Sequence, residues 1–114
     1  MIVDRVDMDR VTVLRLEGDL DETGVESLRT AMYECACDGR FRLIMNLADV
    51  GFMSYMAVGV LVERLRKVRS FGGDIKLVSI NTYVQRLFRM VGVKTLFDTY
   101  ETEPQAVSTY REAA

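Results

Sequence analysis

The sequence contains no histidine and no tryptophan, and it has only two cysteines and one proline. Histidine is the commonest general base and a frequent zinc ligand, so its absence excludes Ser-His, Cys-His and HExxH chemistry. Cys35 and Cys37 are two positions apart in an expected helix, where residues i and i+2 do not face each other. We expect one thiol to be buried and the other exposed, with no disulfide, no metal site, no cofactor and no catalytic residue.

Long hydrophobic runs and an excess of one charge are also missing. The longest uncharged stretch covers the 13 residues from Val50 to Val62, whereas about 20 apolar residues are needed to cross a bilayer. The N-terminus lacks the basic and apolar regions of a secretory signal, so we expect a cytoplasmic protein without membrane insertion. Fifteen basic against seventeen acidic residues give a net charge of −2, which argues against a nucleic-acid partner.

The residues that are present favour one globular domain spanning residues 1–114, because 49% of the 114 residues are hydrophobic and 28% are charged. Apolar periodicity predicts alternating strands and helices in the order β-β-α-β-α-β-α-β-α. The predicted fold class is therefore α/β, with a mixed sheet of four to five strands, antiparallel at its start, and about four helices.

Local signals place these elements along the chain. Thr23 and Glu26 are expected to cap the first helix reciprocally, and Asn81 to cap the third. The segments 18–22 and 48–53 are expected to be connections. The strands are expected at 2–6, 9–16, 43–47, 75–80 and 95–97; the helices are expected from Thr23 to Gly39, from the 48–53 connection to Gly72, from Asn81 to Gly92 and from Glu103 onward. Val91 is expected on the buried stripe of the third helix.

A set of motifs spread over nearly the whole chain resembles the STAS domain, and in particular the bacterial anti-sigma factor antagonists. The motifs are Val13-x-x-Leu16-x-Gly18-x-x-Asp21, Leu43-Ile44-Met45-Asn46-Leu47-x-x-Val50-x-Phe52-Met53, Gly59-Val60-Leu61, Gly72-Gly73 and Val84-x-x-Leu87-Phe88-x-x-x-Gly92-Val93. The resemblance implies a protein-binding regulator of transcription that binds an anti-sigma factor, a serine kinase of the GHKL type, and so releases a sigma factor. Antagonists of this family are switched off when that kinase phosphorylates a serine at the start of the second helix.

The sequence departs from the family at this switch, where the family pattern is Asp-Ser-Ser/Ala-Gly-x-Gly. Alignment on Phe52-Met53 and Gly59 puts Ser54 on the aspartate, Tyr55 on the phosphorylated serine, Met56 on the next small residue and Ala57 on the first glycine. On this alignment Ser54 is the helix N-cap. The partner-binding residues that the resemblance implies are Gly18, Asp19, Leu20, Asp21, Ser54, Tyr55, Met56, Ala57 and Gly59, with Ser54 and Tyr55 as the regulatory positions.

Three interpretations of this loop remain open. Ser54 is a structural cap and the module is not switched by serine phosphorylation; or another kinase acts on Ser54 or Tyr55; or the chain is a STAS subunit of a membrane transport or lipid-trafficking complex. A small enzyme or ligand-binding domain is a further alternative, since α/β folds host many functions. The basic residues of the second helix are either a solvated face or a site for an acidic partner or a phosphate; they are Arg64, Arg66, Lys67 and Arg69. The oligomeric state is not predicted.

Overall fold

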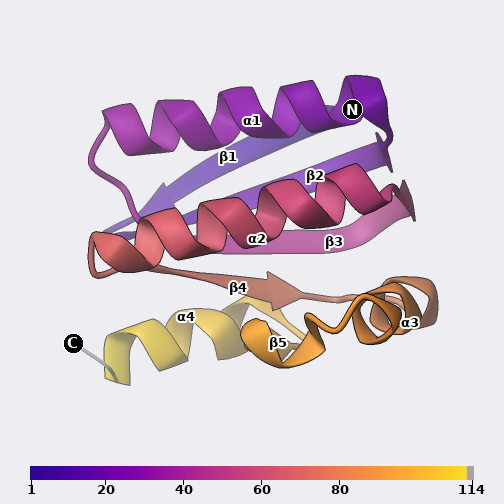
Figure 1. Cartoon of the computed structure of the whole chain (residues 1–114). Helices are drawn as coiled ribbons and strands as arrows, with labels where there is room; N and C mark the ends of the chain where they lie inside the picture. Colours follow the sequence, from indigo (N-terminus) through magenta and orange to yellow (C-terminus); the bar gives the residue numbers. More distant parts are fainter. Residues whose placement is uncertain (113–114) are drawn as a thin grey trace.

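The computed structural model describes residues 1–112, which form a five-stranded sheet with helices on both faces (Figure 1). The strands are β1 (Ile2–Met8), β2 (Val11–Leu20), β3 (Arg42–Met53), β4 (Asp74–Val78) and β5 (Thr99–Tyr100). The helices are α1 (Glu22–Cys37), α2 (Tyr55–Ser70), α3 (Thr82–Met90), the 3-10 turn η1 (Lys94–Leu96) and α4 (Glu103–Glu112).

The strands lie in sequence order across the sheet, and only β1 runs antiparallel to its neighbour. The later pairs are parallel, as expected when a helix connects successive strands. This topology confirms the predicted α/β class and the mixed sheet that is antiparallel at its start. It also places the carboxyl ends of β2 and β3 at one edge of the sheet, where α1 and α2 begin (Figure 1).

Alternating strand residues build a core on each face of the sheet. Leu14 and Met45 belong to the larger core, which α1, α2 and α3 cover, whereas Val13 and Ile44 belong to the smaller core under α4. The predicted stripe of α2 is buried throughout; it consists of Val58, Leu61, Leu65 and Val68. Burying a leucine side chain completely stabilises the fold by about 1.5–3 kcal/mol, so this stripe fixes α2 on the sheet.

The residue predicted to cap α1 is the wrong one. Asp21, not Thr23, is the N-cap, and its carboxylate accepts a hydrogen bond of 2.8 Å from the Gly24 amide. Thr23 lies inside the first turn. A carboxylate at this place also interacts favourably with the positive end of the helix dipole.

The strands β2 and β3 are longer than predicted. The segments 18–20 and 48–53, expected to be connections, pair in parallel with Gly18 opposite Val50 and Leu20 opposite Met53. Two register shifts interrupt this pairing. Because each bulge disturbs the two-residue alternation, the apolar pattern conceals the strand extension.

Three boundaries near the C-terminal half also differ from the prediction. The fourth strand ends at Val78, followed by Ser79 with a φ of 60°. The segment 95–97 is not a strand, because η1 occupies Lys94–Leu96 and Phe97 packs on Phe88 with ring centroids 5.6 Å apart. Val91 is the C-cap of α3 and is exposed, not part of its buried stripe.

Candidate functional site

The starts of α1 and α2 lie side by side because the strands that precede them pair to their last residues. The Ser54 amide donates a hydrogen bond of 3.0 Å to the Leu20 carbonyl. This contact joins the end of β2 to the first residue after β3. The two segments that the sequence predicted as a partner-binding surface, 18–21 and 54–59, are therefore brought together.

Ser54 begins α2 as its N-cap, as predicted. Its backbone is extended (φ −76°, ψ 161°), and its hydroxyl oxygen accepts a hydrogen bond of 3.1 Å from the Ala57 amide. The side chain is half-buried. Ser54 therefore has a structural role as the cap of α2.

Exposed apolar side chains surround this helix start. Tyr55 is 64% exposed, Phe52 45% and Met56 44%. Phe52 stacks on Tyr83 at a centroid separation of 6.5 Å, and the Tyr83 hydroxyl donates a hydrogen bond of 3.1 Å to the Met53 carbonyl. We call Phe52, Tyr55, Met56 and Tyr83 the apolar platform; the start of α3 holds two of its rings in place.

Not every predicted partner-binding residue reaches the surface. Leu20 and Ala57 are completely buried, so their side chains pack in the core. Gly18 is half-buried, and Asp19 and Asp21 are exposed beside the platform. Gly59 is exposed on α2, and a Cβ there would meet no atom within 4 Å, so this glycine leaves open surface.

Two residues that pack at the site, Gly24 and Tyr83, were not predicted from the sequence. Gly24 packs so closely against the end of β2 that a Cβ would overlap the Asp19 carbonyl. Tyr83 completes the platform. Neither has a local sequence signal, because both contacts join segments that are far apart along the chain.

The basic residues of α2 do not form one cluster. Arg69 makes an ion pair of 3.0 Å with Asp74 and donates a hydrogen bond of 2.8 Å to the Leu96 carbonyl. Arg64 is half-buried, whereas Arg66 and Lys67 are exposed. Arg69 therefore holds α2 to the neighbouring segments, whereas Arg66 and Lys67 remain exposed on α2.

Both cysteines of the chain are free, with Cys35 buried and Cys37 exposed. The burial of Cys35 raises the pKa of its thiol, which makes it less reactive. Among the side chains of residues 1–111, no group of three that could bind a metal is found. Over the backbone described, residues 1–112, no helix is long and apolar enough to cross a membrane.

Comparisons with known proteins find relatives over most of this chain. An anti-sigma F factor antagonist from Paenibacillus polymyxa is 26% identical over 102 residues, which cover 86% of this chain and 85% of the relative. An anti-sigma-B factor antagonist from Staphylococcus aureus is 22% identical over 99 residues, with coverages of 87% and 92%. These relatives are named as regulators and not as enzymes.

Solved structures show the same fold at low sequence identity. An anti-sigma factor antagonist from Mycobacterium paratuberculosis superposes with a TM-score of 0.85 at 22% identity, over 96% of this chain and 93% of that chain. The anti-sigma factor antagonist SpoIIAA in its unphosphorylated form superposes with a TM-score of 0.77 at 23% identity, with coverages of 96% and 98%. The model of the STAS domain family matches residues 3–106, and the chain therefore belongs to the STAS domain family.

Proposed function

We propose that residues 1–114 form one regulatory STAS domain that binds an anti-sigma factor and thereby releases a sigma factor. The observation that carries this proposal is the apolar platform at the start of α2, beside the end of β2. The names of the relatives support the same function, because an anti-sigma factor antagonist acts by name against an anti-sigma factor. They do not favour a subunit of a transport or lipid-trafficking complex.

The platform has the chemistry of a protein-binding surface. Three side chains within five positions of the sequence, Phe52, Tyr55 and Met56, are each between 44% and 64% exposed. Aromatic residues and methionine are enriched at the centres of protein interfaces. Tyrosine adds a large apolar area with a polar tip. Asp19 and Asp21 give the surface an acidic rim that favours a partner with basic side chains around an apolar centre.

We further propose that serine phosphorylation of the usual kind does not control this binding. The position at which antagonists of the family carry the phosphorylated serine is Tyr55 here, and the nearest serine, Ser54, caps α2. A phosphate on Ser54 would lie at the positive end of the helix, where a negative charge is favourable. A charge on Tyr55 would instead lie on an exposed side chain of the platform.

The partner we propose is a serine kinase of the GHKL type, which this chain would bind in the cytoplasm. The chain would act by binding alone and would catalyse no reaction. The surface offers no convergent nucleophile, base and orienting group. Binding is expected to use Gly18, Asp19, Asp21, Ser54, Tyr55, Met56 and Gly59, with Leu20 and Ala57 positioning them from the core.

A pull-down from the native bacterium tests this proposal. Tagged wild type is compared with Tyr55→Glu, which places a charge on the platform, and with Tyr33→Glu, since Tyr33 on α1 is also 64% exposed. Mass spectrometry should identify a GHKL-type kinase with wild type and with Tyr33→Glu, and not with Tyr55→Glu. Recovery of transport subunits in its place would contradict the function, and equal recovery by both variants would contradict the surface.

A further inference from the structure

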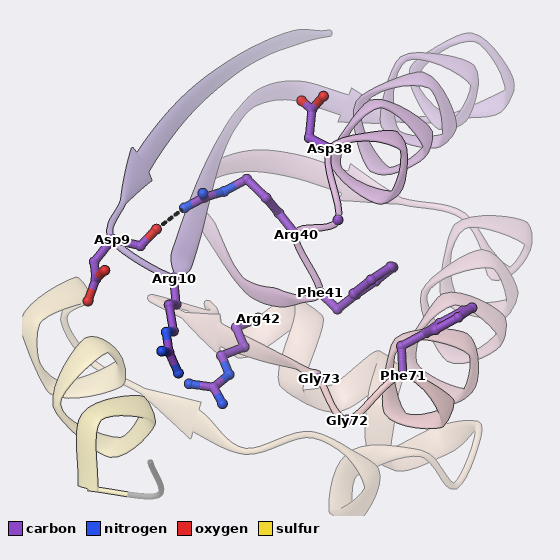
Figure 2. A pocket seen from close by; sticks show the side chains of 10 residues that line it. Asp9, Arg10, Asp38, Arg40, Phe41, Arg42, Phe71, Gly72 and Gly73 are labelled. Atoms are coloured by element: carbon purple, nitrogen blue, oxygen red, sulfur yellow. Dashed lines mark hydrogen bonds between the residues drawn. The ribbon is translucent and has the colours of Figure 1, made fainter.

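Two hollows lie side by side at the edge of the sheet opposite to the apolar platform. The first has a volume of about 320 Å³ and lies between the β1–β2 turn, the α1–β3 connection and the α2–β4 turn (Figure 2). The second has a volume of about 340 Å³ and reaches to the last turn of α4. Arg10 and Arg42 line both hollows.

The backbone brings these two arginines together. Arg10 follows Asp9, a non-glycine residue with a φ of 51°, in the tight turn between β1 and β2. Arg42 begins β3 and is paired with Val11, the residue after Arg10. Figure 2 shows the two guanidinium groups next to each other and pointing the same way. Arg111, in the last turn of α4, lines the second hollow.

The neighbouring carboxylates are largely bound to other cations. Asp7 and Asp38 pair with Arg5 at 3.0 and 2.8 Å, and Asp74 pairs with Arg69. Among the side chains of residues 1–111, none forms an ion pair with Arg10 or Arg42. Asp9 also lines both hollows, so its negative charge offsets part of the positive charge there.

Arg40 differs from these arginines although it lines the first hollow. Its guanidinium donates hydrogen bonds of 2.7 and 3.0 Å to the carbonyls of Asp9 and Val11. It also contacts Asp7 at 3.3 Å. Arg40 therefore fixes the turn that carries Arg10. Arg10 and Arg42 are left as the cationic groups that could contact a ligand.

We propose that Arg10, Arg42 and Arg111 bind a small polyanionic phosphate compound. Adjacent guanidinium groups repel each other, and an anion between them removes that repulsion. The planar fork of arginine matches the oxygen atoms of a phosphoryl group, and such charge-assisted hydrogen bonds are about twice as strong as neutral ones. A hollow on each side of the Arg10–Arg42 pair gives room for two phosphoryl groups.

Titration of the full chain with inorganic pyrophosphate tests this site. The experiment is isothermal calorimetry at physiological ionic strength, because salt screens non-specific attraction to exposed charges. Wild type should bind saturably at one site. The double variant Arg10→Gln/Arg42→Gln should raise the dissociation constant by about tenfold or more, since two charge-assisted contacts are lost. Arg42→Lys should give a smaller loss, because it keeps the charge without the fork.

The matched control is Arg66→Gln/Lys67→Gln, which removes the same charge from exposed positions of α2. It should change the dissociation constant by less than about twofold, as expected for distant screened charges. An equal loss in this control, or no saturable binding by wild type, would overturn the proposal.

Two further measurements keep the site distinct from the proposed function. Amide chemical shifts on pyrophosphate addition should move at residues 9–11 and 40–42; movement centred on the start of α2 would contradict the site. Tyr55→Glu should leave pyrophosphate binding unchanged, because the platform lies at the other edge of the sheet. Circular dichroism of the Arg10→Gln/Arg42→Gln and Arg42→Lys variants shows whether a loss of binding reflects loss of the fold.

Discussion

Arg15 on β2 and Glu103 at the start of α4 form a two-pronged ion pair, although 88 residues separate them in the sequence. The Nη2–Oε1 and Nε–Oε2 distances are 2.8 and 2.9 Å. The side-chain amide of Asn46 donates a hydrogen bond of 2.8 Å to the same carboxylate. This pair fixes the last helix to the sheet, and Arg15, followed by Asn46, holds the pKa of Glu103 below its usual range.

The ion pair predicts a loss of stability in acid. A carboxyl group with a lowered pKa in the folded state contributes stability that is present above its unfolded pKa, near 4.5, and is lost as pH falls through the folded pKa. We expect Glu103→Gln to unfold at lower urea concentration than wild type at pH 7, with a difference that shrinks below pH 4.5. Urea denaturation at several pH values measures this.

The control for this experiment is Glu101→Gln, two residues away on the exposed surface. Its urea midpoint should stay close to that of wild type at each pH. If the difference between Glu103→Gln and wild type persisted at pH 2, the contribution would come from packing and not from the ionised carboxylate.

Removing the N-cap of α2 should destabilise the fold. Ser54→Ala leaves the Ala57 amide without its hydrogen bond, which costs about 1 kcal/mol on typical capping data. Ser54→Asp should restore the cap and most of the stability, since aspartate is an equally good N-cap. Urea unfolding of the three proteins measures this, and equal destabilisation by both substitutions would show that the cap hydrogen bond is unimportant.

Two glycines near the helix starts should respond oppositely to alanine. At Gly24 a Cβ overlaps the Asp19 carbonyl, whereas at Gly59 it meets nothing within 4 Å. We expect Gly24→Ala to lower the free energy of unfolding by about 1–3 kcal/mol, the usual range for overpacking. Gly59→Ala should raise it by up to about 1 kcal/mol, because alanine is the better helix former.

Partner binding gives a second test of Gly59→Ala. If the partner approaches α2 at Gly59, then Gly59→Ala weakens the complex while stabilising the free protein. Calorimetric affinity for the partner recovered in the pull-down, compared with the thermal midpoint of the same variant, distinguishes these effects. A destabilised Gly59→Ala variant would contradict the open surface found at this position.

The sequence predicted most of the fold because helices and covered strands leave periodic apolar patterns. The buried stripe of α2 and the capping role of Asn81 follow directly from such patterns. The extension of β2 through Leu20 and β3 through Met53 does not, because bulges shift the register there. Asp21 and not Thr23 caps α1 because of where β2 ends, which local spacing does not determine.

The partner-binding residues of the candidate site stay a prediction, and the surface they would form did not follow from the sequence. Alignment placed Tyr55 at the switch position, and the cap at Ser54 followed from that alignment. Burial of Leu20 and Ala57, and the stacking of Tyr83 on Phe52, depend on contacts between distant segments. Such contacts are set by tertiary packing, which a single sequence does not encode locally.

Tyr110 on α4 predicts a loss of stability in alkali. It is 5% exposed, and its hydroxyl lies 2.8 and 2.7 Å from the carbonyl oxygens of Leu43 and Asp74. Burial, reinforced by Asp74, raises its pKa far above the usual value of 10. A raised folded pKa contributes stability that is complete below the unfolded pKa and is lost as pH rises through the folded one.

We therefore expect wild type to lose stability above pH 10 more steeply than Tyr110→Phe, which has no phenol to ionise at this site. At pH 7 wild type should be more stable than Tyr110→Phe, because the variant lacks a buried hydrogen bond worth about 1 kcal/mol. Urea unfolding between pH 7 and pH 11 measures both effects, with Tyr55→Phe as the exposed control. Parallel curves for wild type and Tyr110→Phe above pH 10 would mean that another group governs alkaline unfolding.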